Sequence, residues 1–213
     1  MWAARIPEGY VFGGMSTECV RTLEGVPLLL ESRDPRVLER LYPDTCSDEQ
    51  DEAQWREHAV PELERLFASR GTIVRKDLAA MRAVGDAASR VLLIPEGHTN
   101  AWLASLNAAR LALYALNDLN ADWMSGYELE SATDKQREAI ARIHLLAEIQ
   151  AVLLGEFELE VADPDDVEKF AAEAAAEDDD LDGGAAEGDD AGGEDDGDDA
   201  DGPRGRGPLS PRG

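Results

Sequence analysis

Two side chains on one predicted helix come nearest to a binding constellation in this sequence. Asn107 and Arg110 stand three residues apart, a spacing that places both on nearly one side of a helix. With Asn100 earlier on the same helix, they could form a binding notch. The alternative is that they pair with acids and backbone carbonyls of neighbouring helices, because a buried arginine must be satisfied. Pairing is the commoner outcome for buried charge, yet Asn100, Asn107 and Arg110 remain the candidate binding residues.

The histidines and cysteines show no spacing that is typical of catalysis or metal binding. His58, His98 and His144 fall on different predicted helices, without an HExxH or Glu-x-x-His pattern. Cys19 and Cys46 form no CxxC pair and have no histidine at ligand spacing, which argues against a disulfide scaffold or a zinc ribbon. Phosphate-binding glycine motifs are also missing. The sequence therefore predicts no catalytic residue, no metal site and no cofactor.

The strongest helical pattern in the chain is the one that carries Asn107 and Arg110. It opens at Pro95 and Glu96 and continues through Tyr114 or a few residues further. Its apolar residues recur at spacings of four, three, four and three, so they share one face. They are Trp102, Leu106, Ala109, Leu113 and Leu116. We expect this face to form the centre of the hydrophobic core.

Weaker patterns predict further helices and a little sheet. Ser16, Asp34 and Thr133 are good N-caps, each followed by a helical segment. The predicted segments are 16–30, 36–41, 51–69, 73–90 and 133–155. Pro61 is expected to bend the third of these and Gly71 to end it. Tyr10–Phe12 and Val91–Ile94 are predicted as two short strands that pair. The predicted fold is mainly α, a helical bundle with at most a small two-stranded β ribbon.

The charge divides the chain into two parts. Of the net charge of −26, residues 163–213 carry −15, from 19 acidic side chains, Lys169 and three arginines, which leaves −11 for residues 1–162. After Phe170 there are no aromatic residues, so this stretch has too little apolar area to offset the entropy of the chain. We expect a mainly helical globular domain over 1–162 and a disordered, acidic, low-complexity tail over 163–213.

This acidity limits the classes of partner. Nucleic-acid binding depends on Lys and Arg displacing counterions from phosphates, so an acidic body argues against it, whereas a negative field attracts basic proteins. The tail could act as a lure for such a partner or only as a solubilising extension. The apolar runs are far below the ~18 residues of a membrane span, and the start has no signal-peptide pattern. We expect a cytoplasmic protein that binds no membrane.

The strongest helix also carries a resemblance. The run Leu93–Leu113 is similar to a bacterial family of unknown function, a DUF family best known from actinobacteria, with Ala-Trp-Leu, Leu-Asn and Arg-Leu in the same order after an acidic start. Arg40–Pro43 and Trp55–Phe67 resemble its earlier segments, so the resemblance covers about residues 10–156. Genes of this family lie beside that of the Clp protease adaptor ClpS. The resemblance implies a helical fold and a role in regulated proteolysis. Asn107 and Arg110 are among the residues that match the family's motif.

We therefore expect a non-catalytic interaction or regulatory protein that acts through protein contacts, with a Clp adaptor or protease component as its partner. Two alternatives stay open. One is an enzyme whose site assembles only in three dimensions, around Asn107, Arg110 and one of the histidines. The other is a chaperone for basic proteins that acts through its acidic tail.

Overall fold

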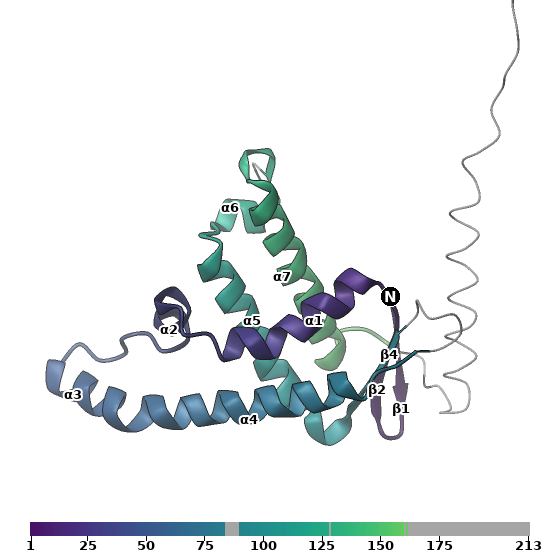
Figure 1. Ribbon diagram of the computed structural model, residues 1–213, viewed down its shortest axis with the longest axis horizontal. Coiled ribbons are helices and arrows are strands. Elements are labelled where there is room, and N and C mark those ends of the chain that lie inside the picture. The colour runs from purple at the N-terminus through teal and green to yellow at the C-terminus, as the bar shows by residue number, and fades with distance from the viewer. Residues whose placement is uncertain (84–89, 128, 160, 162–213) are drawn as a thin grey trace, which may run out of the picture.

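The computed structural model describes residues 1–83, 90–127, 129–159 and 161 of the chain. It is mainly helical, as predicted, with a small sheet at one end of the helices (Figure 1). The strands are β1 Trp2–Ile6, β2 Gly9–Met15, β3 Arg82–Ala83 and β4 Arg90–Pro95. The α-helices are α1 Thr17–Leu30, α2 Pro35–Leu41, α3 Glu49–Gln54, α4 Val60–Ala79, α5 Thr99–Leu116, α6 Ala121–Met124 and α7 Asp134–Leu153. Short irregular turns are the π-helix Trp55–Ala59 and the 3-10 turns Glu96–His98 and Leu129–Ser131.

The sheet is larger than the predicted ribbon. The two predicted strands do pair, because β2 and β4 are antiparallel with Val11 opposite Leu93. However, β1 adds to the other edge of β2, and β3 to the other edge of β4, giving a four-stranded sheet in the order β1-β2-β4-β3. The β1 strand contains two alanines and no β-branched residue before Ile6, so its sequence lacks the signal of a strand. It buries Ala4 and Ile6 against Val11 in a separate small cluster.

The prediction that a helix ends at Gly71 is wrong. Helix α4 continues through Gly71 to Ala79, so the predicted segments 51–69 and 73–90 do not exist as two helices. A Cβ added at Gly71 would lie 3.8 Å from Cδ2 of Leu30 and 4.0 Å from Cα of Pro27 in α1. These are ordinary contact distances, so the crossing of α4 and α1 has room for a methyl group at this position, and glycine marks a helix crossing here, not a helix end.

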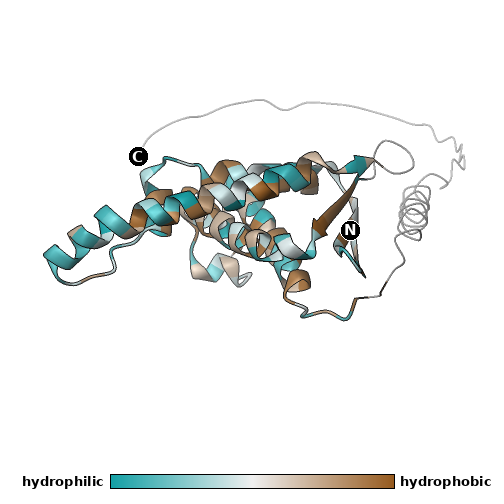
Figure 2. Cartoon of the chain, turned by 90° about the horizontal axis from the view of Figure 1, so that it is seen from below, coloured by the Kyte–Doolittle hydropathy of each residue, from teal (hydrophilic) through white to brown (hydrophobic). Residues whose placement is uncertain are grey.

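The helix α4 is the inner part of a long arm. The helix α3, the π-helix and α4 follow one another without a break, and the π-helical turn lies just before Pro61, near the predicted bend. No residue of α3 or of the π-helix is buried. Figure 2 shows the outer end of this arm as hydrophilic, with apolar residues increasing toward the bundle. Arg56 of the π-helix forms an ion pair with Glu52 of α3 and another with Asp44, and the second of these holds the preceding loop against the arm.

The helix α5 forms the centre of the core, as its spacing predicted. Trp102, Leu106 and Ala109 are completely buried, and Leu113 is nearly so. The helices α1, α2, α4 and α7 all pack against α5. On α7, the buried face includes Leu146, Ile149 and Leu153, whereas Leu154 just after the helix is 57% exposed.

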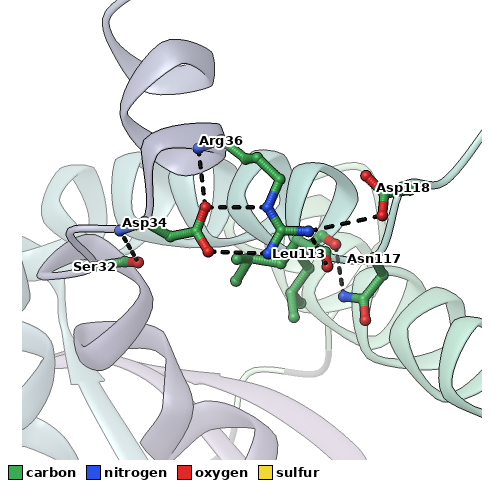
Figure 3. Close-up of polar contacts among 7 residues, drawn as sticks. Ser32, Asp34, Arg36, Leu113, Asn117 and Asp118 are labelled. Atoms are coloured by element: carbon green, nitrogen blue, oxygen red, sulfur yellow. Dashed lines mark hydrogen bonds and ion pairs between the residues drawn. The ribbon is translucent and has the colours of Figure 1, made fainter.

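Local hydrogen bonds begin three of the helices as predicted. Side-chain oxygens of Ser16, Asp34 and Thr133 accept from backbone N–H groups of the first turns of α1, α2 and α7. One long-range contact then fixes α2 on α5 (Figure 3). Arg36 donates from Nε and Nη2 to both carboxylate oxygens of Asp34, and from Nη1 to the carbonyl oxygen of Leu116 over 3.1 Å. The arginine thus caps the C-terminal end of α5, where carbonyls lack partners within the helix.

Two predictions concern residues outside those described: the boundary at residue 162 and the acidic tail, residues 163–213. Within the described ranges, no helix has the length and apolar character needed to cross a membrane.

Candidate binding groove

The three predicted binding residues do not form a common notch. Asn100 and Asn107 are exposed on α5. Arg110 is half-buried and donates from Nη1 to Oε1 of Gln150 on α7 over 2.7 Å. The arginine is therefore paired across a helix interface, with an amide oxygen as its acceptor.

The three histidines are also kept apart. His58 and His144 are exposed on different helices, while Nδ1 of His98 lies 2.9 Å from both carboxylate oxygens of Asp77. The side-chain hydrogen bond of Arg110 goes to Gln150 and not to a histidine. In the described part of the chain, no group of three or more His, Cys, Asp or Glu side chains could hold a metal ion.

The carboxylate of Asp77 is a buried polar centre that sequence analysis missed. Asp77 is 6% exposed near the end of α4, and Nε1 of Trp102 donates to its Oδ2 over 2.9 Å. With His98, two donors from the start of α5 satisfy this carboxylate and join α4 to α5. A signal was present in the sequence, because Asp77 falls three residues after Val74 and beside Leu78, on the inward stripe of its helix.

The two cysteines are free thiols in different settings. Cys46 is exposed in the loop before α3, and Cys19 is buried in α1. Burial raises the pKa of the Cys19 thiol, since the thiolate loses its hydration there. Cys19 is therefore held as the neutral thiol, the less nucleophilic form.

A concave surface lies between α1 and α7. Both helices pack against α5, and between them run two hollows of about 380 Å³ and about 220 Å³. Thr22 and Arg142 line both hollows, so the two adjoin and form one groove, called here the α1–α7 groove. Its lining also includes Gly14, Ser16, Glu18, Cys19, Gly25, Leu28, Leu29, Ser32, Leu113, Glu138, Ala141, Leu145 and Glu148, and Met1.

Two polar atoms in this lining have no partner. Thr22 is 4% exposed, and its Oγ1 makes no hydrogen bond to any residue that the structure describes. Nε of Arg142 is buried without a partner as well, although its Nη1 lies 3.7 Å from Oε1 of Glu138. Most buried polar groups in proteins are hydrogen-bonded. Both atoms are shielded from solvent, and similar atoms lie elsewhere in the described part of the chain, for example Oγ of Ser105 and Nε of Arg110.

The charges along the groove are mainly negative. Glu18, Glu138 and Glu148 line the larger hollow, against the side chain of Arg142 and the amino group of Met1 as cations. Glu18 is paired with Arg21 at 2.6 Å, whereas Glu148 is exposed and forms no ion pair within the described ranges. The smaller hollow is more apolar, and Leu28 at its edge is 66% exposed. A ligand with both apolar and cationic groups would match this surface.

The comparisons with known proteins bear on family membership. A family model described as a domain of unknown function, DUF2017, matches residues 14–157. This range includes α1, α5 and α7 and nearly all of the α1–α7 groove. A search of curated proteins found no match, and a search of solved structures found none. Because the match spans well over half of its length, the chain belongs to the DUF2017 family.

Proposed function

We propose that this chain is a non-catalytic protein-interaction module that binds a segment of a partner protein in the α1–α7 groove. The observation that carries the proposal is the groove itself, which combines apolar side chains with charged ones that are mainly glutamates. Binding sites are typically concave and largely apolar, with a few polar groups that orient the ligand.

The partner should carry apolar and basic residues. The groove has three glutamates against one arginine and the amino group of Met1. The whole chain has a net charge of −26, so the field around it favours approach by a basic protein. The resemblance of the strongest helix to a family encoded beside ClpS suggests the class of partner. We propose a Clp adaptor or protease component, with ClpS as the first to be tested.

A blocked groove tests this proposal. A Cβ added at Gly25, which lines the smaller hollow, meets no atom within 4 Å, so Gly25→Trp places a large side chain at a position that begins in open space. Glu24→Trp places the same side chain at the neighbouring exposed position, outside the groove lining, and serves as its control. Full-length wild-type and variant proteins are immobilised, and purified ClpS and Clp ATPase from the same organism are passed over them.

We expect one Clp component to bind the wild type, with an affinity at least about tenfold weaker for Gly25→Trp and unchanged for Glu24→Trp, as for a central contact. Absence of binding to every Clp component would remove them as partners. Equal binding by both tryptophan variants would remove the groove as the binding surface.

An interaction carried by the acidic tail is the alternative. It is distinguished by repeating the measurement with a chain that ends at Ala162, whose melting temperature is compared with that of the full chain. If a partner binds Gly25→Trp but does not bind the chain without its tail, the protein would act as a chaperone that binds basic proteins through electrostatic attraction.

A further inference from the structure

The long arm formed by α3, the π-helix and α4 has an apolar side that no other element covers. Its residues recur at spacings of four and three, so they follow one another along one side of the arm. We call this side the arm stripe, and its members are Asp51, Trp55, Ala59, Leu63, Leu66 and Arg70. Leu66 is 42% exposed. Among the described residues, the apolar members belong neither to the core cluster nor to the side chains packed against it. An apolar helix face is normally buried against another element.

The neighbouring side of the arm is the one that the rest of the chain covers. The ring of Phe67 lies 5.9 Å from that of Tyr42, measured between centroids. Oε2 of Glu52 accepts from two backbone N–H groups of the loop before α3. The residues that line the gap between the arm and α2 are Arg56, Val60 and Glu64. These contacts use none of the residues of the arm stripe, and Figure 1 shows α3 projecting past α2.

The charge changes sign along the arm. Residues 48–59 carry five acidic side chains and one arginine, whereas residues 65–76 carry four basic side chains and no acid. The arm stripe follows the same order, from Asp51 at its outer end to Arg70 at its inner end. Neither of these two side chains has a hydrogen bond or an ion pair with the described residues. They are separated by nineteen residues, or about 28 Å of helix. They therefore cannot pair within one chain.

A second copy of the arm, turned end to end, matches this order. In a two-fold contact, residue i of one copy meets residue j of the other, and j meets i. Antiparallel arms that cross between Val60 and Pro61 bring Asp51 opposite Arg70 of the second copy. The same alignment brings Trp55 opposite Leu66. A parallel arrangement would instead place Asp51 against Asp51.

We propose that two copies of this chain pair through their arm stripes in antiparallel orientation. An ion pair between Asp51 and Arg70 closes each end of the contact, and the apolar side chains lie between. The net charge of −26 opposes association in general, so the pairing depends on these local contacts. The contact is separate from the α1–α7 groove, whose lining contains no residue of the arm.

Sedimentation equilibrium of the full-length protein tests the pairing, at about 0.15 M salt, where exposed charges more than about 8 Å apart are largely screened. We expect the wild type to show a monomer–dimer equilibrium. Asp51→Arg and Arg70→Glu each put like charges at both ends of the contact, so each should weaken the dimer at least about tenfold. Glu49→Arg and Lys76→Glu make the same charge changes at exposed positions outside the stripe, and both should dimerise as the wild type does.

Mixing the two weakened variants tests the antiparallel order itself. In a mixed dimer of Asp51→Arg with Arg70→Glu, opposite charges meet at both ends. We expect the mixture to form dimers with about the affinity of the wild type, although neither variant does so alone. A variant that had lost its fold could not recover in this way, and circular dichroism melting curves check the fold of each variant separately.

Leu66→Gln tests the apolar part of the contact. Glutamine has nearly the helix propensity of leucine, so the arm keeps its helix. We expect the dimer to weaken at least about tenfold, as for a central interface residue. Leu154→Gln is the control, because Leu154 is 57% exposed and lies outside the arm.

Any of three results would overturn the inference: a wild type that stays monomeric at every concentration, a dimer that Asp51→Arg or Leu66→Gln leaves unchanged, or a mixture that stays monomeric. None of them bears on binding in the α1–α7 groove, which Gly25→Trp tests separately.

Discussion

Trp102 of α5 donates a hydrogen bond from Nε1 to Oδ2 of Asp77 in α4 over 2.9 Å, within the core of the protein. The tryptophan is completely buried and the aspartate is 6% exposed, so neither group can turn to water if its partner is lost. His98 shares the same carboxylate from the turn before α5. This bond sets the start of α5 against the end of α4, and it thereby positions the helix on which α1 and α7 both pack.

Removing the carboxylate should therefore destabilise the fold. We expect Asp77→Leu to lower the free energy of unfolding by about 1–3 kcal/mol, because the Nε1–H of Trp102 is left without an acceptor. Combining it with Trp102→Phe should cost less than the sum of the single changes, by about 0.5–3 kcal/mol, as expected for residues in contact. Urea unfolding followed by circular dichroism measures both. Simple additivity would show that the two residues do not act together.

Gly71 offers a test of the close approach between α1 and α4. A methyl group there would make only ordinary contacts, at 3.8 Å to Leu30 and 4.0 Å to Pro27. We expect Gly71→Ala to raise the free energy of unfolding by about 0.5–1 kcal/mol, since glycine inside a helix is costly. Gly71→Leu should lower it, because the larger side chain must displace Leu30. Gly25→Ala is the control, with no atom within 4 Å. A loss of stability in Gly71→Ala would mean that the helices lie closer than described.

The pair of Asp34 and Arg36 predicts a dependence of stability on pH. Hydrogen bonds from Arg36 hold the pKa of the Asp34 carboxyl below its usual range. The stability that this shift contributes is present above the usual carboxyl pKa of about 3.9, and it is lost as the pH falls through the lower pKa of the folded state. Between pH 5 and the acid limit of folding, Arg36→Met should lose less stability than the wild type, measured by urea midpoints. If the wild type and Arg36→Met lost the same amount of stability as the pH falls, the pair of Asp34 and Arg36 would not contribute to the pH dependence.

The two thiols should differ in reactivity. Cys46 is exposed, while Cys19 is buried and its pKa is raised by that burial. Because the thiolate is the reactive form, we expect Ellman's reagent to modify one thiol quickly in the native protein and the second only after unfolding in guanidinium. Cys46→Ser should remove the fast phase, and Cys19→Ser should leave it unchanged. Two fast thiols in the wild type would contradict the burial of Cys19.

The parts of the fold that were predictable are those that local interactions decide. Ser16 accepts a hydrogen bond from the backbone of Cys19, and Thr133 from that of Gln136, both only three residues away. The helical spacing from Trp102 to Leu113 likewise needs only the geometry of its own helix to place these residues on one face. Family resemblance, too, was carried by such a local run, and the match over residues 14–157 confirms it.

Only the tertiary structure decided the rest, because the deciding partners are distant in the chain. Gly71 continues its helix since Pro27 and Leu30 lie across from it. Arg110 is paired because Gln150, forty residues later, accepts its hydrogen bond. The α1–α7 groove is formed by two helices more than a hundred residues apart, whose spacing is set by the α5 helix beneath them. A sequence pattern reports the face that a helix buries, but a groove depends on how three helices are arranged around one core.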